Sequence, residues 1–251
     1  LAGEAVLEAD LRGDPSGPQI LAELDGSLNG FESGVAALDG LLGDSASLSG
    51  TAQLLPDGFA VTNLALDGAN LTLVADGQAT DEAADLSLDL TIPMLAPLDP
   101  RISAGNGTVE ARLTGSLEAP DVAATAQLRD VVAMDRPIER LTLRLVGRDL
   151  TGDLDAELAL SGLVAGETAE GLARIGRTDT GGYTLDDLDL AIGSVDLAGA
   201  LTIGDAGLAA GEITLDAGDL SDLTPLLLTE LAGALEADVA LSVEEGGQDA
   251  S

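Results

Sequence analysis

The sequence predicts an all-β protein in which many strands follow one another as an antiparallel meander. Apolar and polar residues alternate with a period of two over most of the chain, which is typical of strands with one buried and one solvated face. Hydrophobic residues make up 45% of the 251 residues, although the formal net charge is -35. Both values are compatible if each strand places aliphatic residues on one face and acidic residues on the other.

Tight connections join the predicted strands. The segment 108–114 places Val109, Ala111 and Leu113 on one face, and the phase reverses after the sequence GSLEAP at 115–120. A turn that contains Gly and Pro accommodates this reversal, because Pro is poorly tolerated inside a central strand. The same alternation predicts strands in segments 86–92, 122–128, 141–145, 154–160, 188–192, 195–203 and 235–241, and it fits more loosely in 5–11 and 20–24.

Asp-Gly dipeptides indicate hairpin turns between strands. They occur at 25–26, 39–40, 57–58, 67–68 and 76–77. The spacing leaves strands of roughly 6–10 residues joined by short loops, which favours a meander over parallel βαβ units. Two segments, 32–43 and 220–232, break the alternation, and each predicts a short helix or turn. In the second segment we expect a small apolar cap formed by Leu226, Leu227, Leu228 and Leu231.

A weak internal repeat covers approximately residues 59–128 and 183–251. The run from Phe59 aligns with the run from Tyr183, the run from Leu86 aligns with that from Ile213, and Pro97 corresponds to Pro225. No linker-like run separates the two copies, so we expect residues 1–251 to form a single continuous β-rich region. We interpret the chain, which begins at Leu1 without Met, as a fragment of a longer protein.

The composition argues against several classes of function. The chain has no His, Cys or Lys, so the usual nucleophile and base pairs cannot be assembled, and we expect neither an enzyme nor a bound cofactor. The acidity argues against nucleic acid, whose phosphates are bound by clustered Lys and Arg. We expect no metal site, because Gly181-Gly182 leads into Tyr183 without a calcium-binding nonapeptide period.

Two features leave alternatives open. The arginines from Arg129 to Arg148 either bind an anionic group such as a lipid phosphate or pair across strands with Asp and Glu, and we favour the pairing. The aliphatic face is either the core of a closed sandwich or a surface open to hydrocarbon. Cores usually recruit aromatic residues, and only Phe31, Phe59 and Tyr183 are aromatic. A purely aliphatic lining suits a hydrocarbon ligand, which needs no hydrogen-bond partner.

The run GSLEAPDV at 115–122, framed by two alternating segments, resembles a signature of the TamB family. Proteins of this family repeat a Gly-[Thr/Ser]-Leu-x-Ala-Pro-x-Val element between strands, which Gly115, Leu117, Ala119, Pro120 and Val122 match. The segment 128–162 is similar to the same family, and 219–241 resembles the broader AsmA-like group. The full motif occurs once, and the first forty or so residues match least.

The resemblance implies a U-shaped antiparallel groove, the β-taco, which is similar to an open β-solenoid, with one or two short helices. It implies a periplasmic bridge that carries phospholipid between the inner and outer membranes. The inner-membrane anchor and the region that meets an Omp85-type outer-membrane barrel would lie outside this chain. The alternatives are an assembly factor that captures β-strands of outer-membrane proteins or autotransporters, and a closed acidic β-sandwich of adhesin type.

We expect lipid acyl chains to lie along the apolar phase of the predicted strands. The expected lining residues are Leu86, Leu88, Leu90, Val109, Leu113, Val122, Leu128, Leu141, Leu143, Leu145, Leu158, Leu160, Leu188, Leu190, Leu197, Leu201, Ile203, Val239 and Leu241.

Overall fold

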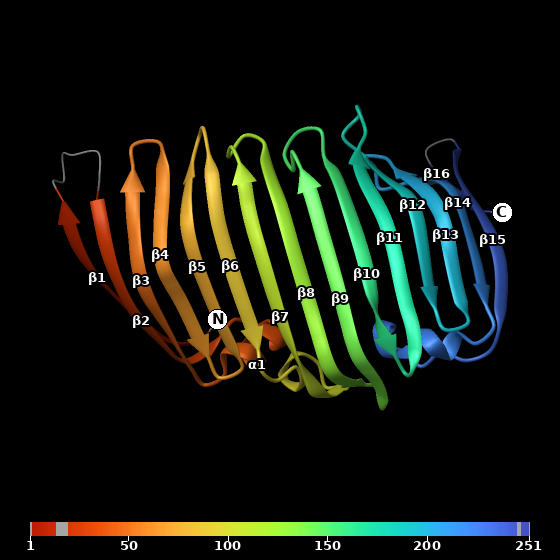
Figure 1. The fold of residues 1–251 in the computed structure, drawn as a ribbon, viewed down its shortest axis with the longest axis horizontal. Helices are drawn as coiled ribbons and strands as arrows, with labels where there is room; N and C mark the ends of the chain where they lie inside the picture. The colour runs from red at the N-terminus through yellow and green to blue at the C-terminus, as the bar shows by residue number, and fades with distance from the viewer. Residues whose placement is uncertain (1, 14–19, 245–246, 251) are drawn as a thin grey trace. The chain divides into compact units, whose positions relative to one another are not determined.

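The computed structural model describes residues 2–13, 20–244 and 247–250 and shows an all-β chain (Figure 1). Strand accounts for 70% of the chain and helix for 8%, so the predicted fold class is confirmed. Strands follow the sequence order across the sheet, neighbours pair antiparallel, and β1 and β16 are the two edges. The sheet is therefore an open meander with short helices, as the alternation predicts.

Hairpin loops connect most strands, whereas three connections contain helical turns. The strands are β1 (Ala2–Gly13), β2 (Ile20–Glu32), β3 (Ser45–Leu55), β4 (Gly58–Gly68), β5 (Leu71–Thr80), β6 (Ala84–Ile92), β7 (Ile102–Gly115), β8 (Pro120–Ala133), β9 (Arg136–Arg148), β10 (Asp155–Val164), β11 (Glu167–Arg177), β12 (Tyr183–Ile192), β13 (Val195–Ile203), β14 (Ala209–Ala217), β15 (Leu235–Glu244) and β16 (Gly247–Ala250). The helical turns are α1 (Ala36–Leu42), η1 (Ala96–Leu98), η2 (Leu220–Leu223) and α2 (Thr224–Leu227).

The chain divides into two compact units, Leu1–Ala126 and Gln127–Ser251, with the boundary inside β8. The order β4, β5, β6, η1, β7 in the first unit recurs as β12, β13, β14, η2, α2, β15 in the second. Pro97 lies within η1 and Pro225 within α2, each at the start of its turn. These are the prolines that correspond in the sequence repeat.

Strand register gathers the aliphatic residues of the first unit into rows. One row crosses five strands, because Leu48 pairs with Leu66, Leu66 with Leu73, Leu73 with Leu90 and Leu90 with Val109. Directly paired residues share a face of the sheet and alternate residues take opposite faces. The unit therefore has an apolar face that carries this row and a polar face that carries the acidic residues between.

The second unit repeats this arrangement with glycine among the leucines. Leu143 pairs with Leu160, Leu160 with Gly171, Gly171 with Leu190 and Leu190 with Leu197. In each unit we call the side of the sheet that carries these rows the apolar face and the reverse side the polar face.

Helical turns cover one end of the apolar face in the first unit. The connection that contains α1 joins β2 to β3, and η1, against which α1 packs, joins β6 to β7 at the same end of the strands (Figure 1). A buried cluster of Leu42, Ala46 and Leu71 forms there, with strand leucines packed around it. We call this the capped end, and the end with the β3–β4 and β5–β6 hairpins the open end.

The capped end of the second unit contains its best-buried side chains. The η2–α2 connection lies between β14 and β15, and the largest fully buried side chains are Val164, Ile192, Val195 and Pro225. The first three are the ends of β10 and β12 and the start of β13, next to that connection. Burial of large side chains in the second unit is thus concentrated beside the connection that contains helical turns, whereas small residues such as Ala156 are also buried at the other end.

The residues that are buried in the second helical connection are not the leucines predicted to form an apolar cap. Thr224 and Pro225 are the buried residues of α2, whereas Leu227 is exposed and Leu226, Leu228 and Leu231 are half-buried. Leu228 ends the helix in a left-handed conformation (φ 51°). In the described part of the chain, no helix has the length and apolar character to span a membrane.

Three of the five Asp-Gly turn predictions are wrong. Asp57-Gly58 and Asp67-Gly68 lie beside hairpin turns, but 25–26 lies inside β2, 39–40 inside α1 and 76–77 inside β5. Glycine serves close packing at the two strand positions. A Cβ on Gly77, whose φ is +127°, would lie 2.0 Å from the carbonyl oxygen of Asp85 on β6.

Candidate functional site

The nineteen expected lining residues all lie in strands. Seventeen are half-buried, Leu141 near the capped end is buried and Ile203 at the open end is 37% exposed. Several are direct cross-strand partners, as in the pairs Leu86–Leu113 of the first unit and Leu145–Leu158 of the second. Half-burial follows from the fold, because neighbouring aliphatic side chains cover one another laterally but the described strands provide no second sheet above them.

A hollow of about 170 Å³ opens in the apolar face of the second unit. Its wall includes Leu143, Leu158, Leu160, Leu188 and Leu190. Its centre is β11, where Gly171 and Ala173 replace the leucines of the neighbouring strands. The hollow exists because small residues on one strand leave room between the long side chains of β10 and β12.

Strand β11 was not predicted from the sequence. Its apolar phase runs Ala169, Gly171, Ala173 and Ile175, and its polar phase contains Leu172, so the contrast between phases is weak. Alternation of small and charged residues between Glu167 and Arg177 is the signal that identifies this strand. The floor of the hollow was therefore missed although its leucine walls were predicted.

Among the residues that the structure describes, the apolar hollow has no group placed for acid–base chemistry. Asp189 is the titratable residue at its boundary, and its register opposite Leu172 and Ala198 places its side chain on the polar face. In the parts of the chain that the structure describes, no group of three or more His, Cys, Asp or Glu residues is arranged to hold a metal. The hollow thus offers dispersion contacts and burial of apolar area, without a group placed for proton transfer.

The expectation that the arginines from Arg129 to Arg148 pair across strands with carboxylates is met in register by Arg148, which lies directly opposite Asp155, and is wrong for Arg140 and Arg144. In the described part of the chain, none of Arg129, Arg136, Arg140, Arg144 and Arg148 is among the arginines within 4.0 Å of a carboxylate. Register is the reason for two of them, because Arg144 faces Ala159 and Arg140 faces Leu163.

Ion pairs form elsewhere on the polar face. Arg174 lies 3.8 Å from Glu157 and 3.3 Å from Asp187. In the first unit Arg112 donates two hydrogen bonds of 2.9 Å to Asp85, which lowers the pKa of that carboxyl. Arg101 likewise lowers the pKa of Asp99 to about 2, through side-chain and backbone hydrogen bonds. Apart from the half-buried Asp99, these groups are exposed, and none of them lines the apolar hollow.

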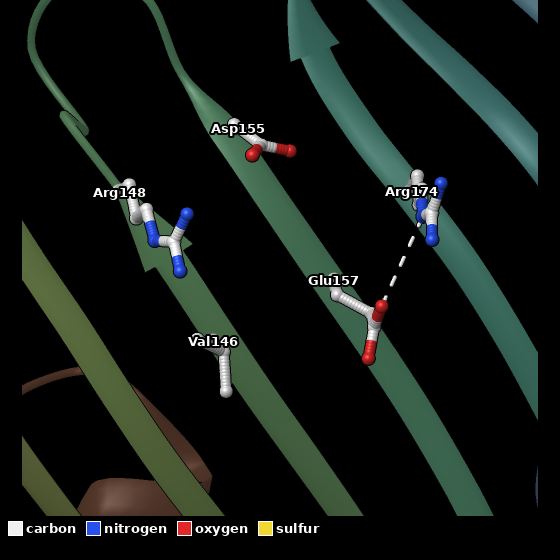
Figure 2. Close-up of a pocket in the computed structure, with 5 residues that line it drawn as sticks. All are labelled: Val146, Arg148, Asp155, Glu157 and Arg174. Atoms are coloured by element: carbon white, nitrogen blue, oxygen red, sulfur yellow. Dashed lines mark ion pairs between the residues drawn. The ribbon is translucent and has the colours of Figure 1, made fainter.

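The polar face of the second unit has a second hollow, of about 460 Å³ (Figure 2). Val146, Arg148, Asp155, Glu157 and Arg174 line it. Two guanidinium groups and two carboxylates balance in charge, and Figure 2 shows Glu157 turned toward Arg174. This hollow is a gap between charged side chains, so the apolar face is the stronger candidate for a functional site.

Comparison with protein-family models, curated proteins and solved structures returns no match for this chain.

Proposed function

We propose that this chain is a segment of a periplasmic bridge whose apolar face shields lipid acyl chains while phospholipid moves between the inner and outer membranes. The observation that supports the proposal is the half-exposed aliphatic face, which runs over successive strands in each unit. Contiguous exposed apolar surface of this kind usually marks a binding site, because an uncovered patch favours association with another apolar body.

Hydrocarbon is the ligand that this surface suits. Burying a methylene contributes about 0.8 kcal/mol and requires no directional contact. Rows of leucine, valine and alanine present nearly the same environment from strand to strand, so no single position holds a chain strongly. The face then supports sliding of an acyl chain rather than its retention.

The charge of the chain is consistent with an open face. Acidic residues such as Asp89, Asp189 and Asp216 lie on the polar face of a chain whose formal net charge is -35. Like charge opposes pairing of two copies through their apolar faces and keeps an open sheet in solution. The inner-membrane anchor and the Omp85-type partner are part of the proposal through the TamB resemblance and would lie outside this segment.

Capture of β-strands is the second candidate function. Among the described strands, the edge strand β1 pairs with β2 alone, its described side chains are exposed throughout, and Leu11 is 68% exposed. An edge of this kind presents backbone donors and acceptors to an extended client. The closed sandwich finds no support, because the strands form one open sheet.

Photo-crosslinking tests the proposal at matched positions. Photoreactive residues at Leu143 and Leu197, on the apolar face, should capture phospholipid in cells, and mass spectrometry of organic extracts should identify it. Arg144 and Asp189, on the polar face of the same unit, are the controls and should capture none. Equal capture at both sets, or capture at the controls alone, would overturn the lipid function.

The same experiment separates the two candidate functions. Strand capture predicts protein adducts at β1 positions such as Val6, competition by alternating strand peptides, and no lipid at Leu143. Lipid capture that such peptides leave unchanged favours the bridge.

A further inference from the structure

One row of residues at the open end of the second unit differs from the aliphatic rows. Arg177 pairs in register with Tyr183, and Tyr183 pairs with Ile203. The neighbouring row of the same face consists of Ile175, Leu185 and Leu201, two residues closer to the capped end on each strand. Alternation therefore places Arg177 and Tyr183 on the apolar face, where the aliphatic surface ends.

The Arg177 side chain is fixed without a carboxylate. Its Nη1 donates hydrogen bonds to the carbonyl oxygens of Thr151 at 2.7 Å and Gly152 at 3.3 Å, and its Cζ lies 5.7 Å from the centroid of the Tyr183 ring. Among the described residues no carboxylate lies within 4.0 Å of it. In a chain with 45 Asp and Glu residues, this arginine keeps its positive charge uncompensated by an ion pair and keeps Nε and Nη2 available to an acceptor.

The distance along β11 from the apolar hollow to Arg177 matches the length of an amphiphile. Gly171 and Ala173 form the floor of the apolar hollow, and Arg177 lies six and four residues farther along the same strand face. At about 3.3 Å per residue this is roughly 13–20 Å. One leaflet of a bilayer has a hydrocarbon thickness of about 15 Å, half of the roughly 30 Å core. An acyl chain with its end in the hollow would bring the phosphate of its lipid to Arg177.

The first unit has a row that corresponds to Arg177, Tyr183 and Ile203 but contains no charged residue. Leu54 pairs with Phe59, and Phe59 pairs with Ala79, at the open end of its apolar face. Phe59 corresponds to Tyr183 in the sequence repeat, and the two rings are exposed to a similar degree, 42% and 44%. Leucine thus occupies the cross-strand position that arginine occupies in the second unit, so the polar row is specific to the second unit.

We propose that Arg177 and Tyr183 form a binding site for the phosphate of a glycerophospholipid whose acyl chain lies on the adjacent apolar face. This inference rests on the proposed lipid function and adds a headgroup site to it. The planar guanidinium presents paired donors that match phosphate oxygens. Tyrosine has an apolar ring and a polar hydroxyl, which suits the boundary between hydrocarbon and water.

Two lipids with the same acyl chains test the site on the 251-residue chain. Dioctanoyl phosphatidylcholine has an anionic phosphate that is balanced by its choline group, so the lipid has no net charge. Dioctanoylglycerol lacks the phosphate. Calorimetric titration should give a Kd about tenfold lower for the phospholipid, the size expected for a charge-assisted hydrogen bond. Tyr183 is the single tyrosine and there is no tryptophan, so a change in intrinsic tyrosine fluorescence on binding reports on this row.

Arg177→Leu converts the row into the type found in the first unit. It should abolish the preference for the phospholipid and leave the Kd for dioctanoylglycerol unchanged. Arg144→Leu removes the same charge from the polar face, where Arg144 has no carboxylate partner among the described residues, and should behave like the unmodified chain. If Arg177→Leu fails to fold, as judged by circular dichroism, Arg177→Gln provides the same comparison.

Each other outcome has a distinct meaning. Equal affinity of the unmodified chain for both lipids, or equal weakening of both by Arg177→Leu, overturns the headgroup site and leaves the lipid function standing. Failure of both lipids to bind, together with no lipid adduct at Leu143, overturns the lipid function and this inference with it. Inorganic phosphate that alone produces the full fluorescence change would show a site for free phosphate and overturn the lipid assignment.

Discussion

Gly77 shows how a single residue permits two strands to approach. Its φ of +127° lies in a region that side chains with a Cβ rarely adopt, and an added Cβ would lie 2.0 Å from the Asp85 carbonyl oxygen. The neighbouring Asp76 side chain accepts a hydrogen bond of 2.7 Å from the backbone N–H of Asn63, which itself has a positive φ of 46°. A local irregularity of β4 and β5 therefore depends on this Asp-Gly pair.

Gly77→Ala should destabilise the first unit by about 1–3 kcal/mol, because it adds backbone strain and a steric clash. Gly34→Ala in the same unit is the matched control, since Gly34 also has a positive φ of +83° but no heavy atom lies within 4 Å of the added Cβ. Urea denaturation followed by circular dichroism measures both variants. An equal loss of stability in the two variants would show that the contact with Asp85 contributes nothing.

The Asp-Gly pairs also show what sequence could not resolve at this scale. The dipeptide fits a hairpin turn at Asp57-Gly58, but at Asp76-Gly77 it fits a strand irregularity. Both uses exploit positive φ or missing side-chain volume, and only the neighbouring backbone decides between them. The position of Arg177 could not be predicted for a similar reason, because its place on the apolar face depends on the register between β11 and β12.

At the scale of whole elements, strands rich in leucine were predictable and strand β11 was not. Leu86, Leu88 and Leu90 contrast with the polar residues between them, so β6 follows directly from alternation. Gly171 and Ala173 contrast little with Leu172, so hydrophobicity does not define β11. The walls of the hollow were predictable for this reason, whereas its floor was not.

The η2–α2 connection is held to the sheet by a compact hydrogen-bond network. The Ser194 hydroxyl donates to Asp222 Oδ2 at 3.0 Å and accepts a 2.8 Å hydrogen bond from the Asp219 N–H. The Ser194 N–H also donates to Asp222 Oδ2 at 2.9 Å. Ser194 therefore joins the turn between β12 and β13 to the segment that covers the capped end.

Ser194→Ala should loosen this cap, because both hydrogen bonds of the hydroxyl are lost. Amide hydrogen exchange across residues 219–231 should accelerate by about threefold to tenfold, matching roughly 0.5–1.5 kcal/mol for a hydrogen bond at an exposed site. Leu227→Ala is the control in the same segment, because the Leu227 side chain is exposed and makes no hydrogen bond. Unchanged exchange in Ser194→Ala, or equal acceleration in Leu227→Ala, would refute a role for the hydroxyl network.

At the scale of the whole molecule, acidic side chains face one another across strands within each unit. Asp196 pairs directly with Asp216, and Asp216 pairs with Glu236 on the polar face of the second unit. Asp89 and Glu110 form such a pair in the first unit. Like charges directly opposite in a sheet are destabilising, so the composition that keeps an open sheet soluble also lowers its stability.

Salt should therefore stabilise this chain. Raising sodium chloride from 0.01 to 1 M shortens the Debye length from about 30 Å to about 3 Å, which screens repulsion between exposed carboxylates. We expect the thermal unfolding midpoint to rise by several degrees, as measured by circular dichroism at pH 7. Asp216→Asn is the control, since it removes the central charge of one acidic row and should raise stability at low salt by about 0.2–1 kcal/mol while reducing the further gain from salt. A midpoint independent of salt, or an equal salt response in Asp216→Asn, would show that cross-strand repulsion does not limit the stability of the sheet.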